Sequence, residues 1–499
     1  MEVSSDNQVS TSKEVVVGTP TTSRFTRSQQ PPTGATGRDD VGGLLQRTQS
    51  SRFTRSQQAP PTGEAHRSCS HRSLGAILAF LQLGFIFLFV FGSTYSTELY
   101  SPLEYTIYRD IMAMLIIGFG YLMTFLRKYG LGAVGFVLML TALGMQLSIF
   151  MEHFVHFVYY PENTPFPLPL TLTKLIDAEF FTATLLITYG AVLGRASPFQ
   201  LVMIMISESF FYAINKVMLV FGVFGAEDVG GTMTIHMFGA YFGIAVTKAL
   251  GQRAHRSGNE ASNRFGDVIA FIGTTVLWVF WPSFVGATET GEPENEMRCV
   301  INTILALFGS TGAAFYLSFV LGKGKFDAVH IQNSTLAGGV AVGSSARLDM
   351  GPGGATLLGV LAGLVSVAGY FYSTPFLLNK FGINDTCGVH NLHGLPAVLG
   401  GLASAVFVTM DHDAEFLSYG RPQQAWRQIA ATVATIALAS VSGFLTGLLL
   451  VKTKNPAARE YDDSMWWWED ECYEQMGVDS EGGEDSDEGD EEDNEGHKE

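Results

Sequence analysis

Long apolar runs, separated by short polar segments, follow one another from residue 74 to residue 451. A helix that crosses the hydrocarbon core of a bilayer needs about 20 mainly apolar residues. The runs predict twelve membrane-spanning helices, at residues 74–95, 108–126, 131–151, 174–194, 198–224, 229–250, 267–286, 299–321, 327–345, 353–377, 387–410 and 427–451. The pattern therefore predicts an all-α polytopic membrane protein with one membrane domain at residues 74–452.

Composition strengthens this prediction and adds two polar tails. The chain is 47% apolar and 15% charged, whereas soluble proteins carry about 25% charged residues. The net charge of −17 is local, because residues 460–499 hold nineteen acidic residues and one lysine. We predict an acidic disordered cytoplasmic tail at 453–499 and a disordered cytoplasmic leader at 1–73. The leader contains near-identical segments that start at Ser23 and Ser51; they are either plain solvated chain or sites for acidic lipid or phosphorylation.

Charge in the loops predicts the orientation. An even number of spans places both termini on one side of the membrane. Loops on that side carry most of the Lys and Arg, for example at 127–128, 253–264 and 452–459, whereas the loop from Glu289 to Glu296 on the other side is acidic. Since basic loops stay inside, both termini are expected to be cytoplasmic. The tryptophans at 466–468 either anchor the acidic tail to an interface or remain solvated with it.

One motif occurs twice, as Asp228-Val-Gly-Gly-Thr-Met-Thr-Ile-His236 and as Asp385-Thr-Cys-Gly-Val-His-Asn-Leu-His393. In each copy a glycine follows the aspartate by three residues and a histidine follows it by eight. The two copies begin spans that run in opposite directions, which is typical of an inverted repeat. Eight helical residues cover roughly 12 Å, so both histidines are predicted near the membrane midplane, side by side.

The aspartates and histidines of this motif have different predicted roles. Asp228 and Asp385 each precede a helix whose first amides need acceptors, so both are predicted to cap helices first and to act electrostatically second. Paired His236 and His393 can pass a small hydrogen-bonding molecule or accept a proton. Zinc is disfavoured because neither cysteine nor a further carboxylate accompanies the pair. His390, three residues before His393, either extends the polar track or, as we favour, packs or bonds a carbonyl.

Three segments resemble the Rh glycoprotein branch of the ammonium transporter/Rh (Amt/Mep/Rh) superfamily: residues 230–243, residues 330–343 and residues 385–396. The resemblance covers residues 74–452. It implies eleven core helices, arranged as a 5+5 inverted repeat and a last helix, with 74–95 as an extra N-terminal helix. It also implies a homotrimer in the plasma membrane, with one pore in each subunit. The implied substrate is ammonium or ammonia, conducted mainly as NH3, with CO2 as a debated second substrate.

The resemblance also assigns roles to individual residues. His236 and His393 match the twin histidines of the pore. Phe180 and Phe284 match the stacked phenylalanines that close the pore on its outer side. Asp327 matches an acid of the inner vestibule.

Three further positions matter in this comparison. Asp228 matches the acid beneath the outer vestibule. Lys216 stands where the Rh branch commonly has Glu near the outer vestibule, and a cation there opposes ammonium enrichment unless its side chain turns away. His390 replaces a usual Asn.

The leading hypothesis is therefore a passive ammonia channel with a twin-histidine pore. A non-conducting scaffold or ammonium sensor that acts through its tails is the alternative, and electrogenic ammonium transport is a third possibility. No nucleophile–base constellation or cofactor motif is evident in the sequence. An enzyme, a cofactor, a metal and a nucleic-acid partner are therefore not expected.

Overall fold

The computed structural model describes residues 69–96, 102–251, 261–289, 292–411, 417–453 and 461–467. These ranges contain the whole predicted membrane domain except short segments between its helices. The predicted leader up to residue 68 and the acidic tail from residue 468 lie outside them.

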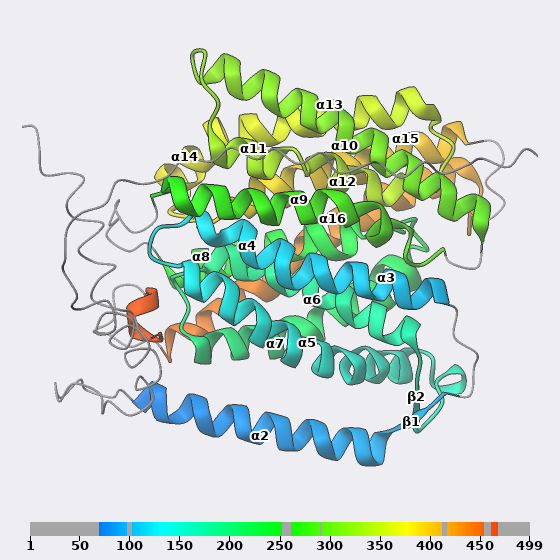
Figure 1. Ribbon diagram of the computed structural model, residues 1–499. Helices are drawn as coiled ribbons and strands as arrows, with labels where there is room; N and C mark the ends of the chain where they lie inside the picture. Colours follow the sequence, from blue (N-terminus) through cyan, green and yellow to red (C-terminus); the bar gives the residue numbers. More distant parts are fainter. Residues whose placement is uncertain are drawn as a thin grey trace, which may run out of the picture. The chain divides into compact units, whose positions relative to one another are not determined.

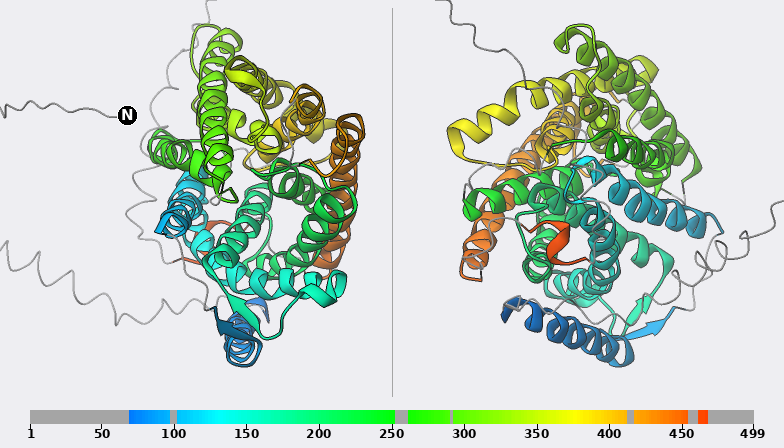
Figure 2. Two further views of the ribbon diagram at one scale, coloured as in Figure 1. Left: turned by 90° about the vertical axis from the view of Figure 1, so that its right-hand side faces the viewer. Right: turned by 60° about the vertical axis from the view of Figure 1, so that its left-hand side comes forward.

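The described residues form a bundle of long helices with one small two-stranded sheet (Figure 1). Its elements are α2 (Cys69–Gly92), β1 (Ser93–Tyr95), α3 (Pro102–Ala113), η1 (Met114–Phe119), α4 (Gly120–Leu122), η2 (Met123–Phe125), α5 (Gly130–Tyr159), η3 (Pro161–Asn163), β2 (Leu168–Leu170), α6 (Leu172–Val192), α7 (Pro198–Ala213), η4 (Ile214–Val223), η5 (Thr232–Met237), α8 (Phe238–Leu250), α9 (Arg264–Gly286), α10 (Pro293–Leu321), α11 (Ala328–Ser334), α12 (Ala337–Val342), η6 (Gly343–Ser345), α13 (Gly351–Ala368), η7 (Gly369–Ser373), α14 (Thr374–Phe376), η8 (Leu377–Phe381), η9 (His390–Gly394), α15 (Leu395–Met410), α16 (Arg421–Val451) and η10 (Asp463–Met465). Strands β1 and β2 pair in parallel. The left view of Figure 2 looks nearly along the helices and shows them gathered side by side.

Ten helical segments of the described chain are long and apolar enough to cross a membrane. They correspond to ten of the twelve predicted spans. The other two predicted spans, 229–250 and 327–345, are shorter or interrupted helices: the first begins as η5 and continues as α8, and the second breaks at Thr335 between α11 and α12. Both are nevertheless buried in the bundle, where α8 packs against α16 and α6, and α12 packs against α10 and α13. The result is a multi-pass membrane protein.

Helix α2 lies at the edge of the bundle in every view (Figures 1 and 2). Only 6% of its apolar window is buried. Phe85 is its buried contact residue, and Gln82 donates a hydrogen bond of 3.1 Å to Gln146 of α5. A helix that exposes almost all of its apolar surface requires lipid or another apolar surface around it.

Two segments pass through the centre of the bundle in opposite directions. The Arg195 guanidinium donates to the carbonyl of Gly251, which follows α8, and to the carbonyl of Asn384, which precedes η9. The end of α8 therefore lies beside the start of the η9–α15 segment. At the other end, Ser344 bonds Asp228 before η5, and the amide of Asp349 bonds Asp411 after α15. This antiparallel arrangement is the one that the doubled motif predicts.

The segment 461–467 contacts the bundle, although the sequence places it in the tail. The two carboxylate oxygens of Asp463 accept hydrogen bonds of 2.7 Å from the amides of Leu131 and Gly132, in the first turn of α5. The Trp467 ring packs against Phe136, with the ring centroids 5.3 Å apart. Asp463 thus supplies the cap of α5, a helix whose own preceding residue makes no side-chain cap bond.

Helices α10 and α13 approach so closely that glycine is required between them. A Cβ atom at Gly359 would overlap the carbonyl oxygen of Ala306, and one at Gly363 would lie 2.6 Å from the carbonyl oxygen of Ser310. Small residues allow helix backbones in a membrane to meet at this distance.

We expect Gly359→Ala to destabilise the bundle by about 1–3 kcal/mol, because the added methyl group overpacks the α10–α13 contact. The measurement is the midpoint of thermal unfolding of the purified protein in detergent. Gly353→Ala is the matched control on the same helix, since a Cβ there meets nothing within 4 Å. Equal midpoints for the two variants would contradict the prediction.

Candidate functional site

The site is built around the doubled motif, whose first copy starts with a glycine turn. Gly231 has φ +69°, a backbone conformation that glycine adopts without strain. Its amide donates to the Asp228 carbonyl, and its own carbonyl accepts from the amides of Ile235 and His236, at 3.0 Å each. The second of these bonds spans five residues, so His236 lies on a π-helical turn, η5. Such turns are frequent at functional sites.

The second copy repeats this construction. Gly388 has φ +75° and donates to Asp385, and His393 lies on another π-helical segment, η9. The Asp385 carboxylate accepts from the amides of Gly388, Val389 and His390, at 2.8–3.1 Å. The motif thus encodes a carboxylate cap, a left-handed glycine and a π-helical histidine.

The first carboxylate binds more groups than the second. Asp228 accepts from the amides of Met233 and Thr234, from the Thr234 hydroxyl at 2.8 Å, and from the Ser344 hydroxyl at 2.5 Å. Both carboxylates are buried in the bundle. Both carboxylates are therefore occupied by helix starts, and only Asp228 also ties down a separate segment of the chain.

The two histidines meet in the interior of the bundle. Their Nδ1 atoms lie 3.2 Å apart, and the rings stack with centroids 5.2 Å apart and planes 12° from parallel. His236 is 2% exposed and His393 is 3% exposed. The Nε2 atom of His236 has no hydrogen-bond partner among the described residues. Because the bond between the rings uses Nδ1 of each, one Nε2 per neutral ring remains, an acceptor on the ring whose Nδ1 donates and a donor on the other.

The stacked rings of His236 and His393 form the centre of a column of rings. Aromatic side chains continue this column on both sides of the histidines. Phe180 meets Phe284 edge to face, with centroids 5.2 Å apart, and Phe284 lies 6.0 Å from the ring of His236. On the other side, Phe119 stacks on His393 at 6.2 Å. Trp281 stacks on His236 at 5.6 Å. All four of these aromatic rings are buried, and they enclose the histidines in an apolar wall.

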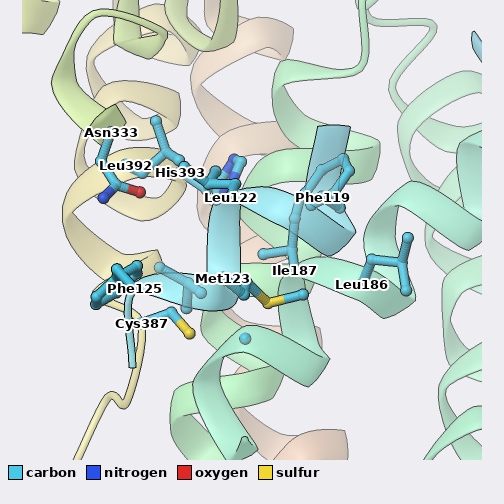
Figure 3. A pocket seen from close by; sticks show the side chains of 12 residues that line it. Phe119, Leu122, Met123, Phe125, Leu186, Ile187, Asn333, Cys387, Leu392 and His393 are labelled. Atoms are coloured by element: carbon cyan, nitrogen blue, oxygen red, sulfur yellow. The ribbon is translucent and has the colours of Figure 1, made fainter. Parts of the chain in front are cut away.

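A small cavity lies against His393 and Phe119, and Phe180 is not part of its lining (Figure 3). Apart from His393 and Asn333, apolar side chains and Gly190 line it. Its lining comes from η1 to η2, from α6, from α11 and from the second copy of the motif, and comprises Phe119, Leu122, Met123, Phe125, Leu186, Ile187, Gly190, Asn333, Cys387, Val389, Leu392 and His393. The column is therefore bounded by aromatic rings at one end and by this cavity at the other.

Lys216 does not turn away from the column. Its Nζ atom lies 2.7 Å from Oε1 of Glu152 and 2.8 Å from Oδ1 of Asp177. The same atom lies 6.0 Å from the centre of the Phe180 ring. The lysine is therefore held between two acids at the Phe180 end of the column.

Asp327 and His390 lie near the site without entering the column. Asp327 is exposed and caps α11 by accepting from the amide of His330, at 3.1 Å. His390 is buried against Tyr241, at 5.9 Å between ring centroids, and its Nδ1 has no hydrogen-bond partner among the described residues.

Sequence reasoning missed several residues that shape the site. Phe119 and Trp281 are ordinary apolar residues of spanning helices, and no local signal marks them. The acidic partners of Lys216 could have been sought, because a buried lysine requires counter-charges, and Glu152 and Asp177 are ionisable residues in or beside predicted spans. Among the described residues, no group of three or more His, Cys, Asp or Glu side chains could hold a metal ion.

The family model that matches this chain is the Ammonium Transporter Family, over residues 73–464. The chain belongs to the ammonium transporter family. It is 43% identical over 371 residues to the ammonium transporter Rh type A of Mus musculus, with 73% of this chain and 81% of that one covered. It is 38% identical over 386 residues to the ammonium transporter Rh type B of Danio rerio, with coverage of 73% and 82%. Among solved structures it is similar to Rh50 of Nitrosomonas europaea, with a TM-score of 0.64, 35% identity, and coverage of 75% and 94%.

Membership of this family makes the protein a membrane transporter rather than an enzyme. The relatives are of the Rh type, as the three motif segments indicate. The matched region ends at residue 464, so it includes the Asp463 contact with α5.

We expect Asp228→Ala to lower stability more than Asp385→Ala. Loss of a capping carboxylate costs about 0.5–2 kcal/mol, and Asp228→Ala also leaves the buried hydroxyls of Thr234 and Ser344 without this acceptor. Thermal unfolding midpoints measure the difference. Ser344→Ala, which removes one donor only, serves as a milder control. An Asp228→Ala midpoint at or above that of Asp385→Ala would refute this ranking.

Proposed function

We propose that this protein is a channel that conducts ammonia across the membrane, mainly as neutral NH3, along the column formed by His236 and His393. The observation that carries the proposal is the histidine pair itself. Its rings are stacked, bonded at 3.2 Å and enclosed by apolar side chains. Family membership supports ammonium or ammonia as the substrate.

The column favours a neutral molecule for physical reasons. Moving an ion from water into an apolar interior costs several kcal/mol or more, and the described wall around the histidines offers no charged group. The edge-to-face contact of Phe180 and Phe284 excludes a hydrated ion. Ammonia needs few hydrogen-bond partners, and the imidazole nitrogens provide them along the way. The apolar wall also admits CO2, which is a second substrate in this proposal.

The proposal includes the arrangement of the chain in the membrane. We infer twelve transmembrane helices, because the two buried segments η5–α8 and α11–η6 pass among the ten long helices. We also infer a 5+5 inverted repeat, which the antiparallel motif copies support, with α2 as the extra helix and α16 as the last. Both termini are placed in the cytoplasm, on the side of the basic loops. The assembly is a homotrimer in the plasma membrane.

Replacement of His393 by Ala is expected to reduce ammonia flux about tenfold, the effect of losing a hydrogen bond worth about 1.4 kcal/mol in the barrier. Stopped-flow measurement of internal alkalinisation in proteoliposomes gives the flux. His390→Ala, three residues away and outside the column, is the matched control and should retain the wild-type ammonia flux. If the wild-type protein alkalinises no faster than empty vesicles, the channel is refuted in favour of a scaffold or sensor. Wild-type flux in His393→Ala would instead exclude the role of this histidine.

Neutral conduction also predicts no protein-dependent transient current when ammonium is added to proteoliposomes on a solid-supported membrane. Net charge does not move if the ion loses its proton before it enters the column. Empty vesicles supply the background signal. A transient current that exceeds this background and scales with protein density would establish electrogenic ammonium transport and contradict the neutral pathway.

A further inference from the structure

The Phe180 end of the column contains an ammonium group that belongs to the chain. The Nζ of Lys216, on η4, contacts Glu152 of α5 at 2.7 Å and Asp177 of α6 at 2.8 Å. The side chains of Lys216 and Glu152 are 12% and 8% exposed. Three separate helical segments therefore build one cation site, in which the Asp177 side chain is 25% exposed.

This site has the chemistry that binds a free ammonium ion. Its two carboxylates accept N–H hydrogen bonds, and the face of Phe180 lies 6.0 Å from the cation, within the range of a cation–π contact. Asp177 precedes Phe180 by three residues, which places the two on the same face of α6. The cation site is thus continuous with the first ring of the column.

Two carboxylates bond one lysine directly, and Oε2 of Glu152 is buried without a hydrogen-bond partner among the described residues. Lys174 is a second, more distant positive charge that acts on Glu152. Removal of the Lys216 amine would leave both carboxylates without the cation that bonds them. A small cation from solution would compensate that charge, and an ammonium ion matches the hydrogen bonds as well.

We propose that Lys216 is a tethered ammonium ion that occupies the chain's own cation site beside Phe180 and so prevents free ammonium from binding there. The consequence for transport rests on the proposed channel function; the occupancy of the site does not. The lysine keeps the site filled at every ammonium concentration. The channel then takes ammonia from solution without a bound ammonium ion at this position.

An ion pair that only stabilises the bundle is the alternative, and it predicts a different response to added ammonium. Buried ion pairs often add little net stability, because desolvation offsets their attraction. Either kind of pair is damaged by truncation of the lysine. Only a cation site of the right size and chemistry is restored by free ammonium or methylammonium.

Thermal unfolding of the purified protein in detergent tests the site without any transport assay. Lys216→Ala should be stabilised by ammonium and methylammonium chloride, saturably and by roughly 2 °C or more beyond sodium chloride at the same ionic strength. The wild-type protein and Lys216→Arg, whose sites remain filled, should not show this increment. An ammonium increment in Lys216→Ala no larger than that of the wild-type protein would overturn the proposal.

A second variant covers the case in which Lys216→Ala fails to fold. Asp177→Asn combined with Lys216→Ala restores the wild-type net charge of the site, with one carboxylate and no lysine. Ammonium-selective stabilisation of this double variant supports the proposal, and its absence overturns it. Addition of Glu152→Gln removes the last carboxylate and should abolish the effect.

Flux measurements test the consequence for transport. The ammonium concentration that gives half-maximal flux should fall about tenfold in Lys216→Ala, which corresponds to about 1.4 kcal/mol of added affinity. Ammonium-selective stabilisation without flux in any variant would retain the cation site and refute the channel. Flux without ammonium-selective stabilisation would retain the channel and refute the cation site.

Discussion

The contact between His236 and His393 is the interaction on which the rest of the site depends. Lipid supplies no hydrogen-bond partners, so polar rings inside a membrane bundle stay in place only if the backbone holds them. Here two π-helical segments bring the rings together from opposite ends of the bundle. Each segment starts at a left-handed glycine and a capping aspartate, so a shift at either start would separate the two nitrogens.

Small residues allow the surrounding helices to approach one another closely and so to hold the two π-helical segments in place. The second, interrupted segment α11–η6 provides Ser344, which ties the Asp228 cap to a distant part of the chain. It also provides Asn333, beside the cavity beyond His393. The two ends of the column then differ, with charged groups beside Phe180 and mainly apolar side chains beyond His393.

The sequence predicted the parts of this structure that have a local signal. Apolar runs located ten of the long helices, and the doubled motif predicted the capping aspartates and the antiparallel passes. The span 327–345 was predicted as one unbroken helix, although the polar run at 332–335 lies where the helix breaks. The π-helical turns depend on tertiary packing and have no pattern of their own. Phe119 and Trp281 acquire their positions only when distant helices meet, and the acids around Lys216 come from helices far apart in the chain. The Asp463 contact was missed because an acidic segment among other acidic residues is typical of solvated tail.

That last contact has a consequence for the order in which the protein is made. The first turn of α5 is capped by a residue 331 to 332 positions later in the chain. During synthesis α5 enters the membrane with these amides open to water. The amides remain uncapped until all later spans have been inserted. Completion of the helix therefore coincides with completion of the whole membrane domain. A chain cut short anywhere before residue 463 would lack this cap.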